Sequence, residues 1–271
     1  MSQKGTNEQK QAVQEQFGKN AEHYVQSPGH ARGDDLALLK EWLGPQSQWT
    51  VLDIATGGGH VARTLAPHVH LVVATDLTRP MLEAASRANQ QAGAENILYV
   101  QADAEQLPFL NESFDAVTCR IAAHHFPQPE QFIREVSRVL KPGGRFLFID
   151  NVVPADPELA GFINRIEKMR DRSHGRCLSV EQWQALFAAN HLRVLRQRER
   201  KKRFDFPAWV RRTSEGPEQE AAVEQFILQA SEQWQAYLEV KVENQRVLTH
   251  QLDEWMVICQ KKGNDEHGDE V

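Results

Sequence analysis

Short apolar runs alternate along the chain with segments of helical spacing. The runs that predict strands are Thr50–Ile54, Leu71–Thr75, Ile97–Val100, Phe114–Cys119 and Arg145–Asn151. Apolar residues at helical spacing follow in Val61–Ala66, Pro80–Ala92 and Pro129–Leu140. Short buried strands between helices are typical of a parallel sheet with helices on both faces. Residues 46–153 are therefore predicted to form a doubly wound α/β core.

The spacing changes after Val153. Helices are predicted over Asp156–Arg172, Val180–Asn190 and Pro217–Tyr237. Later strands are predicted over His191–Arg198, Val240–Asn244 and Glu254–Lys261. Residues 154–262 are thus expected to complete the sheet with an antiparallel strand and to carry a helical substrate cap. Residues 1–10 and the acidic tail 263–271 are polar and are expected to be frayed or disordered.

Composition places the chain among folded globular proteins. Of its 271 residues, 41% are hydrophobic and 25% are charged, which supplies enough apolar material for a sizeable core. The formal charge of −6 provides no basic field for phosphates and argues against a nucleic-acid partner. Arg196–Arg203 is a basic exception interrupted by Glu199, and we interpret it as an exposed edge strand protected by charge.

The cysteines and the apolar runs indicate the cellular compartment in which the protein is expected. Cys119, Cys177 and Cys259 lie far apart and form no CxxC pair, which argues against a disulfide framework or a zinc knuckle. The N-terminus lacks a signal-peptide core, and no apolar run approaches the roughly 20 residues that cross a bilayer. We therefore expect a cytoplasmic protein without membrane insertion.

The strongest local motif is the glycine-rich turn in VLDIATGGGHVA, residues 51–62, between a predicted strand and a predicted helix. Gly57 and Gly59 let the backbone approach a ligand at the helix N-terminus, but this spacing also fits a dinucleotide site. Asp53 distinguishes the two ligands, because a carboxylate here repels a pyrophosphate and attracts an amino group. S-adenosylmethionine carries an ammonium and a sulfonium and has no phosphate, so the residues favour it.

Two further acids follow the next two predicted strands. Asp76 ends VVATD, where an acid can bind both ribose hydroxyls, and Asp103 ends YVQAD, where it can accept a bond from an adenine amino group. A single acid at a strand end is commonly just solvated. Three acids at the ends of consecutive strands lie in the crevice where α/β folds bind ligands, which favours a cofactor site.

Four segments carry a family resemblance: VLDIATGGGHVA, VVATDLTRPMLEAA, VQADAEQLPFLNESFDAVTC and REVSRVLKPGGRFLFID. In this order they resemble the motifs of class I S-adenosylmethionine-dependent methyltransferases, over roughly residues 12–200. The most similar branch contains the ubiquinone/menaquinone-biosynthesis C-methyltransferases. The resemblance implies a mostly parallel, seven-stranded Rossmann-like sheet with an antiparallel C-terminal strand, and S-adenosylmethionine as cofactor.

The resemblance also assigns site residues. It implies that the methionine part of the cofactor is held by Asp53, Ala55, Gly57 and Gly59. It implies that the ribose and adenine are held by Asp76, Leu77, Met81, Asp103 and Ala104, and Arg120 completes the expected cofactor set. Where the class pattern has glycine, this chain has Ala55, and binding is expected to survive one added methyl group.

An N-terminal segment is expected to close the cofactor site. Phe17–Tyr24 resembles the helix-and-lid segment of the branch, so residues 1–45 are assigned to a helical lid. Tyr24, with His30, is expected to cover the cofactor. The alternative, in which Phe17 and Tyr24 only pack an amphipathic helix on the core, stays open.

The region expected to face the methyl acceptor is Cys119–Phe126, directly after the fourth predicted strand. His124 or His125 is a candidate general base, and a structural role at the following proline turn is the alternative. Neighbouring histidine side chains diverge and no third ligand stands at metal spacing, so no metal is predicted. Arg172 and His174 are candidate substrate residues, with solvated loop charges as the alternative reading.

Together these observations predict a methyltransferase that uses S-adenosylmethionine on a small-molecule acceptor. A quinone-like or phenolic acceptor is a hypothesis by analogy, and methylation of carbon, oxygen or nitrogen is left open, as is a monomer or homodimer. Two alternatives are a methyltransferase-like protein that binds a ligand without catalysis and, less favoured by Asp53, a nicotinamide-dependent dehydrogenase.

Overall fold

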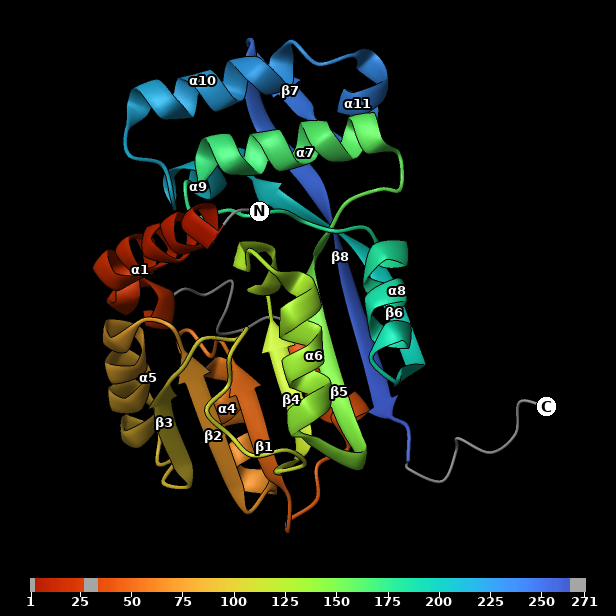
Figure 1. The fold of residues 1–271 in the computed structure, drawn as a ribbon. Coiled ribbons are helices and arrows are strands. Elements are labelled where there is room, and N and C mark those ends of the chain that lie inside the picture. The colour runs from red at the N-terminus through yellow and green to blue at the C-terminus, as the bar shows by residue number, and fades with distance from the viewer. Residues whose placement is uncertain (1–2, 27–33, 264–271) are drawn as a thin grey trace, which may run out of the picture.

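One twisted sheet forms the centre of the computed structural model, which describes residues 3–26 and 34–263 (Figure 1). Its strands are β1 Thr50–Ile54, β2 Leu71–Asp76, β3 Ile97–Gln101, β4 Phe114–Arg120, β5 Leu140–Val152, β6 Leu192–Asp205, β7 Lys241–Glu243 and β8 Arg246–Lys261. Their order is β3-β2-β1-β4-β5-β8-β6, and β7 pairs with β8. Neighbours from β3 to β5 are parallel, whereas β8 is antiparallel to both β5 and β6. The predicted fold class is confirmed, with the short β7 as an additional strand.

Helices flank the sheet and fill the space beyond it. They are α1 Gln3–Gln26, α3 Asp34–Leu43, α4 His60–Leu65, α5 Arg79–Gln91, α6 Pro129–Val139, α7 Pro157–Arg170, α8 Val180–Ala189, α9 Phe206–Arg211, α10 Pro217–Leu228 and α11 Glu232–Tyr237. Two expectations were wrong. Residues 3–10 are not frayed but belong to α1. The single helix expected over residues 217–237 is two helices, because Ser231 caps a new one by accepting the Trp234 N–H.

Both faces of the parallel strands are buried. On one face Leu52 and Val117 pack with α6 and α8, through side chains that include Phe132 and Phe187. On the other face Val51 and its neighbours pack with α3 and α4. Burial on both faces explains why these strands read as continuous apolar runs in the sequence.

A third apolar cluster lies beyond the parallel strands. We call α7, α9, α10, α11 and β7 the cap layer; in Figure 1 it lies above the core. β6 and β8 extend from the core into it, so that Val257 belongs to a core cluster and Leu252 to the cap layer. Among the residues that the structure describes, no helix is long and apolar enough to cross a membrane.

The basic segment 196–203 lies within β6, at one edge of the sheet. Arg200 and Lys202 pair with Glu254 of β8, and Arg196 reaches Glu41 of α3. The basic side chains therefore lie on an edge strand, as expected, and neighbouring acids neutralise part of their charge. Such an edge resists pairing with other chains.

Candidate functional site

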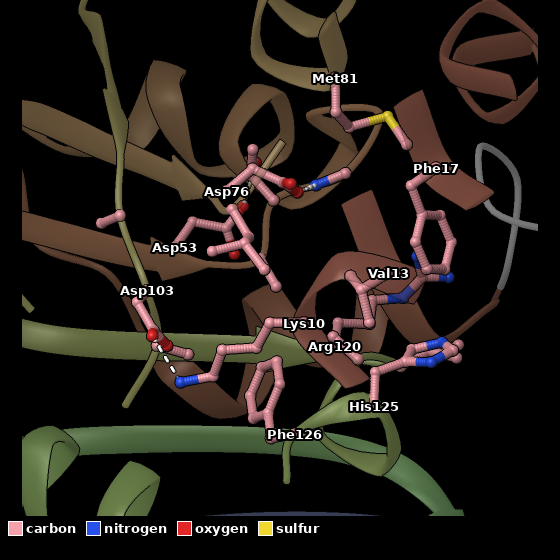
Figure 2. Close-up of a pocket in the computed structure, with 18 of the residues that line it drawn as sticks. Lys10, Val13, Phe17, Asp53, Asp76, Met81, Asp103, Arg120, His125 and Phe126 are labelled. Carbon is pink, nitrogen blue, oxygen red and sulfur yellow. Dashed lines mark hydrogen bonds and ion pairs between the residues drawn. The ribbon is translucent and has the colours of Figure 1, made fainter. Parts of the chain in front are cut away.

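A cavity opens at the carboxyl ends of β1, β2 and β4, and α1 covers part of it (Figure 2). About 1050 Å³ of space lies between its lining atoms, including its open mouth. Nine of the predicted cofactor residues line it: Asp53, Ala55, Gly57, Asp76, Leu77, Met81, Asp103, Ala104 and Arg120.

Two predicted cofactor residues are not among the lining residues. Gly59 begins α4 with φ 73°, and a Cβ there would lie 2.5 Å from Nδ2 of Asn89. The glycine is therefore required for the close packing of α4 on α5, whereas the adjacent Gly58 lines the cavity. The side chain of Tyr24, and all of His30, lie outside the described residues.

Asp53 is a buried carboxylate on the cavity wall. Its Oδ2 accepts a hydrogen bond from Thr56 Oγ1 at 2.6 Å, and its Oδ1 accepts one from Thr118 Oγ1 at 2.8 Å. Burial raises its pKa to about 6, against the opposing effect of these bonds and of Arg120. An anion held at such a cost is stabilised when a cationic ligand group approaches.

Asp76 lies beside the glycine-rich turn at the end of β2. Its two carboxylate oxygens accept the N–H groups of Gly57 at 3.1 Å and of Thr78 at 2.9 Å. Burial raises its pKa to about 6, although these backbone bonds favour the charged form. The bonds fix the orientation of the carboxylate at the cavity and join the ends of β1 and β2.

Asp103 is paired with a residue of α1 that the sequence analysis overlooked. Nζ of Lys10 lies 2.6 Å from Oδ2 of Asp103 and 2.5 Å from Oε2 of Glu105. Oδ1 of Asp103 meanwhile accepts the Glu105 N–H at 2.9 Å. Figure 2 shows Lys10 reaching across the cavity toward Asp103. This interaction fastens α1 over the site.

Arg120 supplies a buried positive charge on the same wall as Asp53. Its Nε donates to the carboxylate of Asp35 in α3, while no partner for its buried Nη2 occurs among the described residues. Buried donors without a partner are rare in folded proteins. Arg120 thus offers a hydrogen-bond donor to an anionic ligand group next to the carboxylate that suits a cationic one.

Two residues just past adjacent strands adopt left-handed backbone angles and line the cavity. Ala55 follows β1 with φ 52°, and Ile121 follows β4 with φ 53°. Such an angle is a strained outlier for a β-branched residue. The Ile121 N–H donates to the Ile149 carbonyl at 2.7 Å, which helps to hold the chain in this conformation. This conformation turns the backbone after Arg120 along the rim of the cavity.

The adjacent histidines have different surroundings. Nδ1 of His124 lies 2.6 Å from Oδ1 of Asp150 and its side chain does not line the cavity, whereas His125 does. Burial opposes the charged form of His124, but Asp150 outweighs it and raises its pKa. His125 bonds the Ser173 carbonyl at 2.8 Å, and burial together with His124 lowers its pKa to about 4. A neutral imidazole therefore borders the cavity, against the ring of Phe17 at a centroid distance of 5.0 Å.

The two candidate substrate residues lie away from the cavity lining. Arg172 is largely exposed and pairs with Glu215 at 2.7 Å. His174 is buried, and its Nε2 lies 3.0 Å from Oδ1 of Asn164 in α7. His174 therefore anchors the loop after α7. The centroid of its ring lies 5.6 Å from that of the His124 ring.

The α1 residues of the cavity carried a signal in the sequence. Lys10, Val13 and Phe17 all line it and are spaced three and four residues apart, which places them on one face of a helix. The polar start of the chain suggested fraying and concealed this face. His60 also lines the cavity, at the first position of α4. No cluster of three metal-ligating side chains occurs in the described parts of the chain.

The charges around the cavity fit S-adenosylmethionine. Its lining includes four carboxylates, those of Asp53, Asp76, Asp103 and Glu105. This acidic lining suits a ligand with an ammonium and a sulfonium and opposes a pyrophosphate. The lining also contains Arg120, whose buried Nη2 has no partner among the described residues, so the cavity offers groups for both charges of an α-amino acid.

Comparisons with known proteins identify the family. A family model described as a methyltransferase domain matches residues 52–148. The chain is 39% identical over 217 residues to the uncharacterised methyltransferase YcgJ of Bacillus subtilis, an alignment that covers 80% of this chain and 86% of YcgJ. The crystal structure of YcgJ is similar with a TM-score of 0.82 and 34% identity, covering 84% of this chain and 98% of that one.

A second relative belongs to quinone biosynthesis. The ubiquinone/menaquinone biosynthesis C-methyltransferase UbiE of Bartonella tribocorum is 41% identical over 115 residues, which are 40% of this chain and 44% of UbiE. The similarity thus spans less than half of either chain. The acidic cavity at the strand ends, the sheet order and the similarity to YcgJ agree: the chain belongs to the class I S-adenosylmethionine-dependent methyltransferases, with S-adenosylmethionine as its methyl donor.

Proposed function

We propose that this methyltransferase acts on a small, uncharged acceptor with an acidic hydroxyl group, of the phenol or hydroquinone kind, and that His125 is its general base. The observation that carries the proposal is the neutral imidazole of His125 on the cavity wall, with Nδ1 bonded to a backbone carbonyl. Because a carbonyl oxygen only accepts, Nδ1 holds the proton and Nε2 can take another.

The cofactor roles follow from the charges of the lining residues. Asp53 binds the ammonium of the methionine part and Arg120 binds its carboxylate through Nη2. Asp76 accepts bonds from the ribose hydroxyls, and Asp103 accepts one from the adenine amino group. The cofactor supplies an electrophilic methyl group, so the protein has to orient the acceptor and remove a proton.

His125 has the protonation state of a base but is a weak one. Its pKa of about 4, lowered by burial and by His124, keeps it neutral at physiological pH. Proton transfer from the acceptor hydroxyl to Nε2 is therefore favoured for acidic hydroxyls over aliphatic alcohols. His124, whose Nδ1 is engaged by Asp150, has a structural role in this proposal.

The walls near His125 support an aromatic acceptor. Phe17 and Val13 of α1 face Phe126 across this part of the cavity (Figure 2). Apolar and aromatic walls favour a flat, uncharged molecule, because an unpaired charge would lose its hydration there. The partial similarity to UbiE, named as a quinone-biosynthesis methyltransferase, supports the same class.

Calorimetry and a turnover assay test the proposal. The purified protein is expected to bind S-adenosylmethionine and to methylate members of a panel of substituted phenols and hydroquinones. His125→Ala should bind the cofactor as the wild type does and lose at least 100-fold in turnover, a typical loss for a general base. His70→Ala, an exposed histidine outside the cavity lining, is the matched control. Normal turnover of His125→Ala would refute the base, and cofactor binding without transfer to any panel member would refute the acceptor class.

A further inference from the structure

The turn formed by residues 171–175 holds the ring of His125. Nδ1 of His125 lies 2.8 Å from the Ser173 carbonyl oxygen. Gln9 of α1 donates to the same oxygen through Nε2, so both lone pairs of this carbonyl are engaged. The direction of the carbonyl thus decides which ring nitrogen of His125 carries the proton.

Asp171 sets the direction of that carbonyl. Its Oδ1 accepts the Ser173 N–H at 2.8 Å and the Ser173 hydroxyl at 2.5 Å. Both residues are buried, with 3% of Asp171 and none of Ser173 exposed, so water does not compete for these bonds. These two bonds hold Ser173 on its N–H side, and the peptide that bears its carbonyl is held through the His174 N–H, which donates to the Asp171 carbonyl at 3.0 Å.

The same turn is joined to the histidine segment by its backbone. The N–H groups of Gly175 and Arg176 both donate to the His124 carbonyl at 2.9 Å. A Cβ at Gly175 would lie only 2.8 Å from that oxygen, so glycine permits this close approach. The turn and the histidine segment therefore form one unit, in which the position of Asp171 is transmitted to His125.

His124 shows the effect of a carboxylate bonded directly to a ring. Asp150 bonds Nδ1 of His124 and favours the imidazolium, which raises its pKa despite burial. Asp171 instead bonds Ser173, whose carbonyl accepts the hydrogen bond from the ring of His125. Burial and His124 outweigh the opposing effects of Asp171 and the Ser173 carbonyl and lower the pKa of His125 to about 4, so His125 stays unprotonated at Nε2.

We infer that Asp171 is a positioning residue, which fixes the Ser173 carbonyl and thereby keeps His125 in the tautomer with Nδ1 protonated and Nε2 able to accept the acceptor's proton. The catalytic consequence rests on the proposed function. The tautomer is a property of the ligand-free protein and is measured without any substrate.

Nitrogen NMR of protein labelled with ¹⁵N-histidine tests the inference. In the wild type, the His125 signals should show the hydrogen on Nδ1. Asp171→Ala should shift His125 toward the Nε2–H tautomer and lower kcat at least tenfold, with the KM for S-adenosylmethionine within twofold of the wild type. Asp171→Asn should restore most of both, because its amide oxygen can accept the same two bonds.

Two further variants keep the test decisive. Ser173→Ala loses the hydroxyl bond and keeps the N–H bond, so a smaller shift in the same direction is expected even if Asp171→Ala does not fold. Asp156→Ala removes the cap of α7, where Asp156 accepts two backbone N–H groups, and should lower stability without changing the His125 tautomer. An unchanged tautomer in both Asp171→Ala and Ser173→Ala overturns the inference. Normal turnover of His125→Ala would instead overturn only the proposed base.

Discussion

At the scale of single residues, the cavity holds carboxylates in surroundings that disfavour their charge. Asp53 is 1% exposed, and burial raises its pKa from 3.8 to about 6. Between pH 4 and pH 6 the folded protein therefore keeps a proton on Asp53, whereas the unfolded chain has already released it. The stability that this proton contributes at low pH is lost as the pH rises through 6. At neutral pH the fold thus carries the cost of a buried charge, which a cationic ligand group at Asp53 would neutralise.

Asp53→Asn is expected to separate stability from binding. The hydroxyls of Thr56 and Thr118, which bond Asp53, can rotate to suit an amide. The free energy of unfolding of the variant should exceed that of the wild type by about 1–2 kcal/mol at pH 7.5 and equal it at pH 4. A carboxylate with a raised pKa destabilises the fold only at pH values above that pKa. It should lose at least tenfold in S-adenosylmethionine affinity. Denaturant titrations at both pH values and calorimetry measure these effects, and equal stability at pH 7.5 would contradict them.

Ala55 stands where the class pattern has glycine, and its backbone angle is one that favours glycine. Its φ of 52° is costly for a residue with a Cβ, by about 1–2 kcal/mol, whereas glycine adopts it freely. Ala55→Gly should therefore raise stability by about 0.5 kcal/mol after the greater entropy of glycine in the unfolded chain is subtracted. Thermal unfolding measures the change, with Ala55→Val as the opposite control. A Tm below that of the wild type for Ala55→Gly would show that the strain is relieved in another way.

Most of the residues predicted to bind the cofactor line one cavity, because the motifs that contain them lie at the ends of strands. Asp53, Asp76 and Asp103 terminate apolar runs, and parallel strands bring such ends to one edge. The angle of Ile121 could not be foreseen in this way, since it is imposed by β4 and by the Ile149 carbonyl rather than by a local residue preference. Nor could the tautomer of His125, which depends on a carbonyl 48 residues away in sequence.

At the scale of elements, α1 connects the two ends of the site. Lys10 bonds Asp103 and Glu105 at one end, and the adjacent Gln9 bonds the Ser173 carbonyl beside His125 at the other. Lys168 of α7 in turn donates to Oε1 of Gln9 at 3.2 Å. α1, of which only the first residues were expected to fray, thus touches the core, the cavity and the cap layer, and its contact with the cap layer depends on residues far away in the sequence.

Lys10→Met is expected to raise the affinity for S-adenosylmethionine about three- to tenfold. Oδ2 of Asp103 is occupied by Lys10, so an adenine amino group has to compete with a full positive charge for that oxygen. The methionine side chain keeps the length of the stem and removes the charge. Calorimetry measures the affinity, and Lys19→Met, an exposed lysine outside the cavity lining, is the control. A lower affinity would mean that Lys10 assists the cofactor.

At the scale of the whole molecule, a histidine in the cap layer links stability to pH. His250 of β8 is 1% exposed, packs 4.3 Å from the Trp209 ring and has no partner for either ring nitrogen among the described residues. Burial lowers its pKa from 6.5 to about 4. The unfolded chain therefore takes up a proton that the folded chain refuses, and stability present above pH 6.5 is lost as the pH falls toward 4.

His250→Phe should remove this dependence. The ring contacts are retained and no group titrates, so any packing change is the same at each pH. The stability of the variant relative to the wild type should increase by about 2 kcal/mol between pH 7.5 and pH 5, because about 1.5 pH units of that range lie below the ordinary pKa of 6.5, at 1.36 kcal/mol per unit. Denaturant unfolding at the two pH values gives the difference. If the difference in unfolding free energy is the same at both pH values, the pH dependence does not come from His250.

β8 has a consequence for how such an enzyme can be re-engineered or diversified. Its side chains enter all three apolar clusters: Val257 one face of the sheet, Ile258 the other and Leu252 the cap layer. Within the cap layer β8 also pairs with β7, and along its length with β6. Exchanging β8 alone would therefore mismatch three interiors at once, and exchanging the cap-layer helices without β8 would mismatch the interior that they share with Leu252. A chimaera between relatives should therefore exchange residues 154–262 as one block, so that the last strand stays with the cap-layer helices that it packs against.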